Sequence, residues 1–487
     1  MSVSASISAQ AASVNIGQRA AAHLLRRIGY GPAPGDIRQV LAQGIERYVE
    51  EQIEAPPDPE LDTRLRRLTT LGYSIAQVLA AYNANNAAIG PILDEFYLAK
   101  LIRAVHGRNQ LQEVLTDFWF NHFNVFIGDG FDRYATPAYE RDAIRPHVLG
   151  RFRDLLGATA AHPAMLFYLD NYLSTVSRVD PRTGRLVQGL YENYGRELME
   201  LHTIGVDAGY TQEHVFDAAR CFTGWGIDQR LGVFVYRPQN HDTGAKSVFG
   251  LNVPAGGGKE DGDRLLDYLA EHPATARFVS RKLLQRFVAD DPSQRLVERT
   301  AATFESSGGD MAAVLRTIIG SAEFWAEAFG TGKPRTPLEF VAGALRAVDA
   351  QVNAGRALTA TLATMGMPLF GCLPPTGYSN RGDDWLNPSS HLARMNFALD
   401  LAANAVNGVA VDVRGLVGRL GADPDNPGAL ADALSREIFG GGLSAQTRNA
   451  AARVSPSGPA QVPNRDAVTV ANRVVGLVLA GPEMQAR

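Results

Sequence analysis

Residues 111–126 read LQEVLTDFWFNHFNVF, and this stretch says most about the expected fold. At about 100° per residue in a helix, Asp117, Asn121 and Asn124 share an arc of about 60°. The aromatic side chains of the same stretch cover the other directions, which indicates a helix that is buried on most sides. We therefore expect a large core in which this helix is surrounded by other elements.

Helical periodicity continues through most of the chain. Further helices are predicted at residues 20–30, 36–54, 75–87, 92–106, 138–147, 152–160, 163–170, 191–203, 211–222, 263–269, 274–288, 310–319, 337–348, 392–405, 429–439, 444–452 and 468–480. β-forming residues gather at 233–236 and again at 247–251, after a polar turn. The predicted fold class is mainly α. We expect one large single-core helical domain over residues 1–487, with a small β-hairpin insertion at residues 224–252 whose strands lie near residues 226–252.

The composition is that of an ordinary globular protein. The chain has 487 residues, of which 45% are hydrophobic and 20% charged, and its formal net charge is −4. This charge gives no general attraction to nucleic acid or to an anionic membrane, so we expect neither as a partner. Cys221 and Cys372 are too few for a disulfide framework and too far apart in sequence for a cysteine zinc motif. Any metal ligands are therefore expected to be oxygen or imidazole.

The sequence shows no targeting or spanning segment. The first eighteen residues contain no Lys or Arg and no apolar run of signal-peptide length, and no segment is apolar enough to cross a membrane. A cytoplasmic location is expected, with a periplasmic or secreted location as the alternative if a leader has been removed.

Lysine is rare in this chain. Five of the 47 basic residues are lysines, namely Lys100, Lys246, Lys259, Lys282 and Lys333. Codon bias in a GC-rich genome is the simplest explanation, so these positions carry no functional prediction.

A second polar stripe lies in residues 191–203, which read YENYGRELMELHT. On a helix, one arc of about 140° holds Glu192, Asn193, Arg196, Glu197, Glu200 and Thr203. This stripe presents three carboxylates, an amide and a guanidinium together. On a surface helix such groups pair with one another and need no ligand. If these groups instead faced the stripe formed by Asp117, Asn121 and Asn124, the two stripes together would form a site.

A site between the two stripes would be rich in negative charge, because Asp117 and three glutamates would oppose the single charge of Arg196. A divalent cation with oxygen ligands relieves such an excess, so the sequence predicts Mg²⁺, Mn²⁺ or Ca²⁺. The predicted ligands are Asp117, Asn121, Glu192, Asn193 and Glu200. The predicted catalytic residues are Arg196 for holding an anionic substrate, Glu197 and Glu200 as base or ligand, and His122, His202 and His241 for proton transfer. The alternative is a polar network that only locks helix packing.

The histidines are weaker candidates when taken singly. His122 and His202 lie off the two polar stripes, a position more typical of a hydrogen-bonded core histidine. His241 opens the turn HDTGAK at 241–246, which either closes over a site or is an Asx-type turn. The sequence has no phosphate-binding loop, no Gly-x-Gly-x-x-Gly after a strand and no Gly-x-Ser-x-Gly elbow, so we expect no nucleotide cofactor.

Ordered motifs along the chain resemble those of DUF1800, a bacterial family of unknown function. The earlier motifs are HLLRR at 23–27, GYGP at 29–32, FWFNHF at 118–123, HPAM at 162–165 and YLDN at 168–171. The central motifs are ENYGRELMELHT at 192–203, GYTQ at 209–212 and FTGW at 222–225. The later motifs are HD at 241–242, HPATA at 272–276, PP at 374–375, RMNFA at 394–398 and PEMQ at 482–485. Tyr191 and Tyr378 stand where the family usually has Asn and Trp.

The resemblance implies a helical fold and little about activity. Many members carry export leaders, and many are encoded beside a sulfatase-like family, which implies a DUF1501-type partner protein. Our first expectation is a divalent-metal-dependent enzyme that acts on an anionic small molecule in a cleft between the Asp117 and Glu192 helices. The alternatives are a non-catalytic scaffold or partner-binding protein and, from the i, i+4, i+8 spacing of Glu192, Arg196 and Glu200, a lyase similar to isoprenoid diphosphate cyclases.

Overall fold

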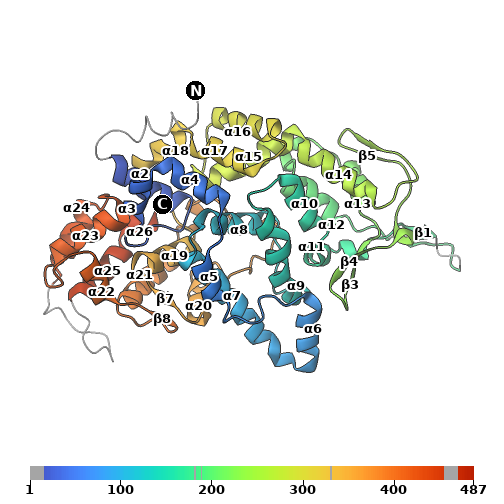
Figure 1. Cartoon of the computed structure of the whole chain (residues 1–487). Helices are drawn as coiled ribbons and strands as arrows, with labels where there is room; N and C mark the ends of the chain where they lie inside the picture. The colour runs from blue at the N-terminus through green and yellow to red at the C-terminus, as the bar shows by residue number, and fades with distance from the viewer. Residues whose placement is uncertain (1–15, 180–181, 188, 330–331, 455–469) are drawn as a thin grey trace.

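The computed structural model describes residues 16–179, 182–187, 189–329, 332–454 and 470–487 (Figure 1). These residues form a mainly helical protein with small two-stranded antiparallel sheets, which confirms the predicted fold class. The α-helices are α2 (Ile16–Arg27), α3 (Asp36–Gln43), α4 (Ile45–Glu54), α5 (Pro59–Leu65), α6 (Ile75–Ala84), α7 (Ile89–His106), α8 (Gln110–His122), α9 (Asp132–Ala138), α10 (Phe152–Ala160), α11 (Pro163–Tyr168), α12 (Asn193–Glu197), α13 (Gln212–Cys221), α14 (Glu260–Glu271), α15 (Pro273–Phe287), α16 (Gln294–Ser306), α17 (Met311–Ile319), α18 (Ala322–Ala326), α19 (Pro337–Ala347), α20 (Arg356–Thr364), α21 (Pro388–Ala402), α22 (Val413–Arg419), α23 (Pro427–Phe439), α24 (Ala445–Ala452), α25 (Val470–Ala480) and α26 (Pro482–Gln485).

Shorter helical turns connect these helices. Two of them are π-helical, η2 (Tyr139–Ile144) and η5 (Leu198–His202). The 3₁₀ turns are η1 (Asn86–Ala88), η3 (Arg145–His147), η4 (Asn171–Leu173), η6 (Val206–Ala208), η7 (Pro238–Asn240), η8 (Glu327–Phe329) and η9 (Asp383–Trp385).

Three of the predicted helices are interrupted. The predicted helix at 36–54 is split into α3 and α4 by Gly44, whose φ of +92° does not fit a right-handed helix. The predicted helix at 191–203 begins as α12 and widens into η5. The one at 138–147 consists of η2 and η3, and it follows Pro137, which removes a backbone donor from α9. Each interruption changes where the following side chains point.

The predicted hairpin insertion is two hairpins. β3 (Trp225–Asp228) pairs with β4 (Val233–Tyr236), and β5 (Lys246–Val248) pairs with β6 (Leu251–Val253). Two further antiparallel pairs were not predicted: β1 (Arg178–Val179) with β2 (Leu186–Val187), and β7 (Gln351–Val352) with β8 (Val409–Ala410). Two-residue strands are too short to show a recognisable alternation in sequence.

Helices from both ends of the described chain share one hydrophobic core. The buried apolar side chains form a connected cluster that runs in sequence from Ala20 to Met484. Near the left-hand end of the view in Figure 1, α2 from the N-terminal part packs against α23 from the C-terminal part. The β3–β4 hairpin lies at the opposite end with α13 and α14.

The aromatic stretch at 111–126 forms α8, which runs through the middle of the molecule (Figure 1). α8 contacts α4, α7 and η2. Trp119 and Phe123 are fully buried, as the sequence predicts for a helix surrounded by others. The helix ends at His122 instead of 126, and Phe123 is its C-terminal cap. α8 is therefore a central, buried helix of the fold.

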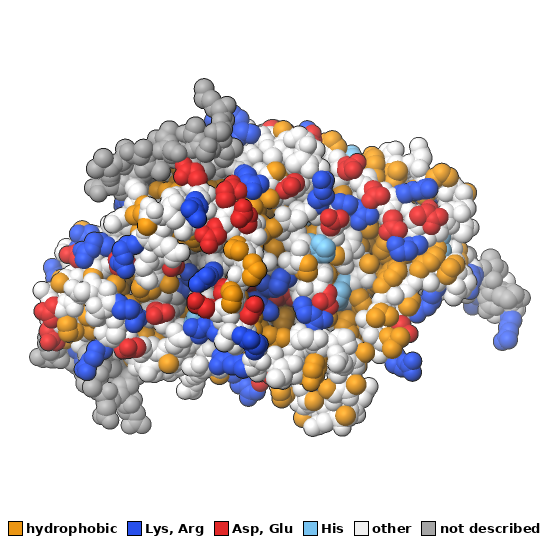
Figure 2. All heavy atoms as spheres, viewed as in Figure 1, with side chains coloured by type: hydrophobic (Ala, Val, Ile, Leu, Met, Phe, Trp, Pro, Cys, Tyr) orange, Lys and Arg blue, Asp and Glu red, His pale blue; other side chains and the backbone are white. Residues whose placement is uncertain are grey.

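The surface carries both signs of charge. On the face shown in Figure 2, acidic and basic side chains alternate and form no large patch of one sign. In the described residues, no helix combines the length and apolar character needed to cross a membrane. The prediction that the chain has no export signal rests mainly on residues 1–15, which lie outside the described residues.

Candidate functional site

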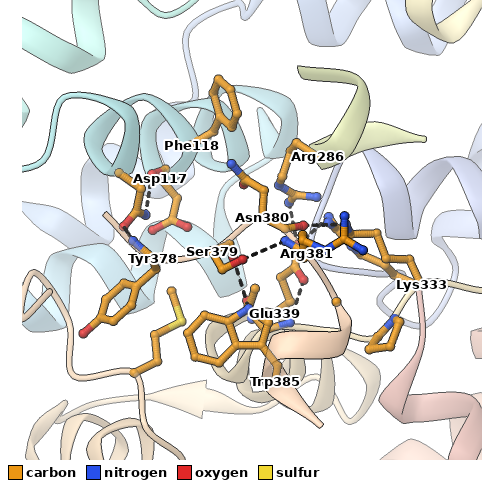
Figure 3. A pocket seen from close by; sticks show the side chains of 16 residues that line it. Asp117, Phe118, Arg286, Lys333, Glu339, Tyr378, Ser379, Asn380, Arg381 and Trp385 are labelled. Carbon is orange, nitrogen blue, oxygen red and sulfur yellow. Dashed lines mark hydrogen bonds and ion pairs between the residues drawn. The ribbon is translucent and has the colours of Figure 1, made fainter. Parts of the chain in front are cut away.

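A small pocket lies beside Asp117, and we call it the Asp117 pocket (Figure 3). Its walls come from α8, α15, the start of α19, residues 367–385 and Arg487. The cavity has a volume of about 20 Å³, which is room for a small polar or ionic group. The charged lining residues are Asp117, Arg286, Lys333, Glu339, Arg381 and Arg487, and larger apolar surfaces come from Phe118, Met367, Tyr378 and Trp385.

Buried cations outnumber acids in this pocket. Arg286 lies 2.7 Å from Glu339 Oε1, and Arg487 lies 2.5 Å from the same oxygen. Lys333 pairs with Asp290, yet burial outweighs that carboxylate and lowers the pKa of Lys333. Within the described structure, Arg286 Nη1 is buried without a hydrogen-bond partner. One glutamate thus serves two guanidinium groups, while Arg286 Nη1 and Arg487 Nε remain as buried donors without a hydrogen-bond partner in the described structure.

Asp117 and Asn121 form the α8 side of the pocket. Asp117 Oδ1 lies 2.9 Å from the amine of Lys100. Asn121 Oδ1 accepts a hydrogen bond of 3.2 Å from the backbone N–H of Tyr378. Gly377, with a φ of +67°, packs so closely on Asn121 that a Cβ atom would overlap its carbonyl oxygen. The polar stripe of α8 therefore anchors the loop that supplies Tyr378.

We expect Gly377→Ala to lower the free energy of unfolding by about 1–3 kcal/mol, because alanine combines an unfavourable φ with the overlap against Asn121. Gly72→Ala is the matched control. Its Cβ would meet nothing within 4 Å, so its effect should stay within about 0.5 kcal/mol. Urea denaturation at pH 7 measures both. Equal effects of the two substitutions would contradict the close packing of the loop on α8.

A buried ionic network lies behind the pocket, and we call it the Lys100 network (Lys100, Glu113, Asp117, Glu140 and Arg145). Lys100 lies 2.9 Å from Asp117 and 3.7 Å from Glu140. Arg145 lies 2.6 Å from Glu113 and 3.1 Å from Glu140. Burial acts to raise the pKa of Glu140, but the neighbouring cations outweigh it and lower that pKa. Acids and bases alternate in the network, and Arg103, which lies 3.9 Å from Glu140, adds a third cation against its three acids. These contacts hold Asp117 in place.

The predicted stripe at 192–200 pairs with itself. Arg196 lies 2.7 Å from Glu192 and 3.4 Å from Glu200. Gln212 of α13 completes the group, since it accepts from Arg196 and donates to Glu192. The side chains of Glu192, Arg196 and Glu200 are 23–33% exposed. This group, which we call the Glu192 stripe, has the geometry of an internally paired, solvated surface.

The two other predicted residues of this segment have separate surroundings. Asn193 Nδ2 donates to Asp170 at 3.1 Å. Glu197 is half-buried, and burial together with neighbouring Glu200 raises its pKa. Glu197 thus keeps some potential as an acid–base group, away from the Asp117 pocket.

The structure places the two stripes in different surroundings. α8 meets η5 through His122, whose Nε2 lies 3.0 Å from the carbonyl oxygen of His202. Asp117 precedes His122 by five residues, which turns it by about 140° around the helix toward the pocket. In the described part of the chain, no hydrogen bond or ion pair joins Asp117 or Asn121 to the Glu192 stripe. The prediction of one cleft between the Asp117 and Glu192 helices is therefore corrected: the Asp117 pocket and the Glu192 stripe are two separate places.

His122 and His202 are core residues. Burial lowers the pKa of His122 well below its ordinary value and that of His202 to about 3, so both rings are neutral near pH 7. Among the described atoms, His122 Nδ1 and His202 Nε2 are buried without hydrogen-bond partners. Neither ring lines the Asp117 pocket. Their predicted part in proton transfer therefore has no counterpart at that pocket.

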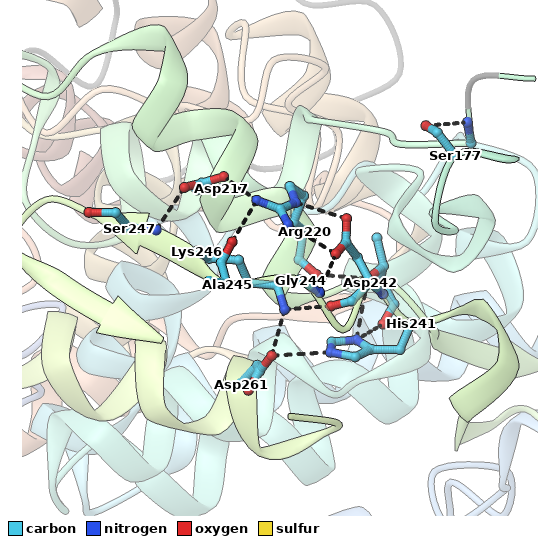
Figure 4. A network of polar contacts seen from close by, with 12 residues as sticks. Ser177, Asp217, Arg220, His241, Asp242, Gly244, Ala245, Lys246, Ser247 and Asp261 are labelled. Atoms are coloured by element: carbon cyan, nitrogen blue, oxygen red, sulfur yellow. Dashed lines mark hydrogen bonds and ion pairs between the residues drawn. The ribbon is translucent and has the colours of Figure 1, made fainter. Parts of the chain in front are cut away.

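His241 belongs to a buried network that fixes the turn at 241–246 (Figure 4). Its Nε2 lies 3.2 Å from Asp261 Oδ2, and the amine of Lys246 lies 2.6 Å from the same oxygen. Asp242 Oδ1 accepts from the N–H of Gly244 at 2.8 Å, which is an Asx-type turn. These contacts favour the turn over a loop that closes on a site.

Most residues of the Asp117 pocket could not be predicted from the sequence. Arg286, Glu339 and Arg487 come from segments more than 160 residues away from Asp117, and no local pattern distinguishes them. Only Lys333 had a feature in the sequence that could have drawn attention to it, because lysine is rare in this arginine-rich chain. Asp117 and Asn121 are the two predicted ligands that reach the pocket.

Comparison with protein families matches residues 23–486 to the family described as "Protein of unknown function (DUF1800)". The chain belongs to the DUF1800 family. The match confirms the resemblance of the ordered motifs, and the DUF1800 region includes the Glu192 stripe and all of the Asp117 pocket except Arg487. No curated protein and no solved structure matches the chain. Family membership therefore assigns no activity, and function must be argued from the site.

Proposed function

We propose that this DUF1800 protein is an enzyme that binds an anionic small molecule in the Asp117 pocket. One observation carries the proposal: two buried guanidinium groups share Glu339, while Arg286 Nη1 has no partner in the described structure. Leaving a buried donor unsatisfied is costly, and a carboxylate or phosphate oxygen forms strong hydrogen bonds with guanidinium. An anionic group of the substrate would complete this arrangement.

Asp117 would act as the acid–base group. It is held by Lys100, it remains partly exposed, and it lines the pocket on the α8 side. A carboxylate placed beside a bound ligand can take up or release a proton during the reaction. Phe118, Tyr378 and Trp385 would contact the uncharged part of the substrate. Because the cavity has room only for a small polar or ionic group, this combination supports a small anion.

The predicted divalent metal stays a prediction. Asp117 and Asn121 are its only predicted ligands at the pocket, and the described residues contain no group of three or more His, Cys, Asp and Glu side chains that could hold a metal ion. The proposal assigns the substrate's charge to Arg286 instead of Arg196. A clamp like that of isoprenoid diphosphate cyclases would need both stripes at one cavity, so we do not propose it.

Calorimetric titration with malonate and with inorganic phosphate tests the proposal, with and without Mn²⁺. We expect the wild-type protein to bind at least one of these anions, and Arg286→Gln to weaken binding at least tenfold. Arg286→Lys, which keeps the charge but loses the planar fork, should weaken it less. Thermal unfolding of each variant identifies any that fails to fold.

Arg196→Gln is the matched control, because it removes an arginine from the Glu192 stripe. We expect its affinity for either anion to stay within about twofold of wild type, a difference of about 0.4 kcal/mol. Loss of binding in Arg196→Gln but not in Arg286→Gln would move the site to the Glu192 stripe. Absence of binding in the wild type under every condition would favour the scaffold alternative.

A further inference from the structure

Buried arginines surround Glu339, the acid on the cationic side of the Asp117 pocket. All of them interact with the charge of Glu339, and each is less than a tenth exposed: Arg27, Arg286, Arg335, Arg394 and Arg487. Arg27 has a second acid, Glu327, at 3.7 Å. Arg335 and Arg394 form no ion pair in the described chain and donate to backbone carbonyl oxygens. Buried cations therefore outnumber acids here, and such an excess favours a bound anion.

Two of these arginines bring free donors to the cavity itself. Arg286 Nη1 and Arg487 Nε have no hydrogen-bond partner among the described residues, and both side chains line the pocket. One arginine belongs to α15 and the other follows α26, so their donors come from two segments. A carboxylate holds its acceptors in one plane, whereas the oxygens of a tetrahedral anion face several directions. In a cavity of about 20 Å³, this arrangement favours a compact tetrahedral oxyanion.

Asp117 distinguishes between tetrahedral anions. Lys100 contacts Asp117 through Oδ1, and no hydrogen bond in the described structure engages Oδ2. The Asp117 side chain is 23% exposed and lines the pocket from α8, so Oδ2 is available to a ligand (Figure 3). An ionised carboxylate only accepts hydrogen bonds. Sulfate has no proton to offer near neutral pH, whereas a phosphate group that keeps one proton can donate it to Asp117.

We propose that the anion bound in the Asp117 pocket is a singly protonated phosphate group. Arg286 and Arg487 donate hydrogen bonds to its oxygens, and the phosphate donates its own proton to Asp117. Free phosphate and a phosphate monoester share this chemistry. The inference rests on the proposed function, because it names the class of anion that the same pocket takes.

Calorimetric titration of the full-length wild-type protein at pH 6.5, without divalent metal, tests the inference. The probes are inorganic phosphate, phenyl phosphate, sulfate and malonate. We expect inorganic phosphate or phenyl phosphate to bind at least tenfold more tightly than sulfate and malonate. Tighter binding of inorganic phosphate would identify free phosphate as the ligand, and tighter binding of phenyl phosphate would identify a monoester.

Two variants test the assigned contacts. Arg487→Gln should weaken phosphate binding at least tenfold. Asp117→Asn replaces an acceptor by an amide that also donates, so it should weaken phosphate binding and strengthen sulfate binding, which reduces the preference for phosphate to less than threefold. Arg196→Gln is again the control and should keep the preference of the wild type. Thermal unfolding identifies any variant that fails to fold.

The wild-type titrations alone can overturn the inference. Sulfate or malonate binding as tightly as both phosphate probes would contradict a protonated phosphate group. If Arg286→Gln still weakened that binding, the proposed anion site would stand and only its assignment to phosphate would be wrong. Failure of all four anions to bind would contradict both the inference and the proposed function.

Discussion

Replacing Lys100 by methionine is expected to lower the free energy of unfolding by about 3–5 kcal/mol at pH 7. Lys100 is buried, and its amine contacts Asp117 and Glu140. Methionine fills a similar volume, but it leaves Asp117 without its cation and Glu140 with only arginine partners. Removing one member of a buried ion pair costs more than the pair contributes, because the remaining charge stays in poorly solvated surroundings. Urea denaturation measures the loss.

Lys259→Met is the control for this experiment, because it removes a lysine from a surface i, i+4 pair with Asp263 and should cost at most about 1 kcal/mol.

The effect at Lys100 should also depend on pH. The network lowers the pKa of Glu140, so its stabilisation is present above the unfolded pKa of about 4.3 and is lost as the pH falls through the lower folded value. The difference in free energy of unfolding between wild type and Lys100→Met should therefore become smaller toward pH 3. A gap below about 1 kcal/mol at pH 7 would show that the network carries little ionic stabilisation.

The sequence predicts the helices better than their interruptions. α8 could be predicted because aromatic residues on all sides of a periodic stretch require burial. The break at Gly44 and the π-helical turns η2 and η5 could not, because they depend on how neighbouring elements pack around a glycine, a proline or a widened turn. The widening into η5 matters most, because η5 contains Glu200 of the predicted stripe.

The candidate site was predictable on one side only. Periodicity correctly placed Asp117 and Asn121 on one face of α8, but it could not say which neighbour that face meets. Tertiary packing decided this, because the His122 face is the one turned to η5. The cations opposite Asp117 come from distant segments, and nothing in their local sequence indicates that they converge. Two polar stripes in sequence are therefore weak evidence for one site.

Asp132→Asn is expected to raise the free energy of unfolding by about 1–3 kcal/mol at pH 7. Asp132 is fully buried at the start of α9, and in the described structure neither carboxylate oxygen has a hydrogen-bond partner. Burial, with a smaller contribution from Asp129, raises the pKa of Asp132 well above its ordinary value. The native protein thus keeps a proton that the unfolded chain releases above about pH 4, so wild-type stability falls as the pH rises toward the folded pKa. Asparagine has no such proton to lose.

The pH dependence makes this expectation specific. The two proteins should be nearly equal in stability close to pH 3, and their difference should grow above pH 4 by at most about 1.4 kcal/mol per pH unit. Asp129→Asn, three residues earlier and exposed, is the control and should change stability by no more than about 0.5 kcal/mol. Urea denaturation between pH 3 and pH 8 measures all three proteins. If Asp132→Asn were less stable than wild type at pH 7, the carboxylate would have to be ionised and bound to a partner, because only a paired charge is favourable at so buried a position.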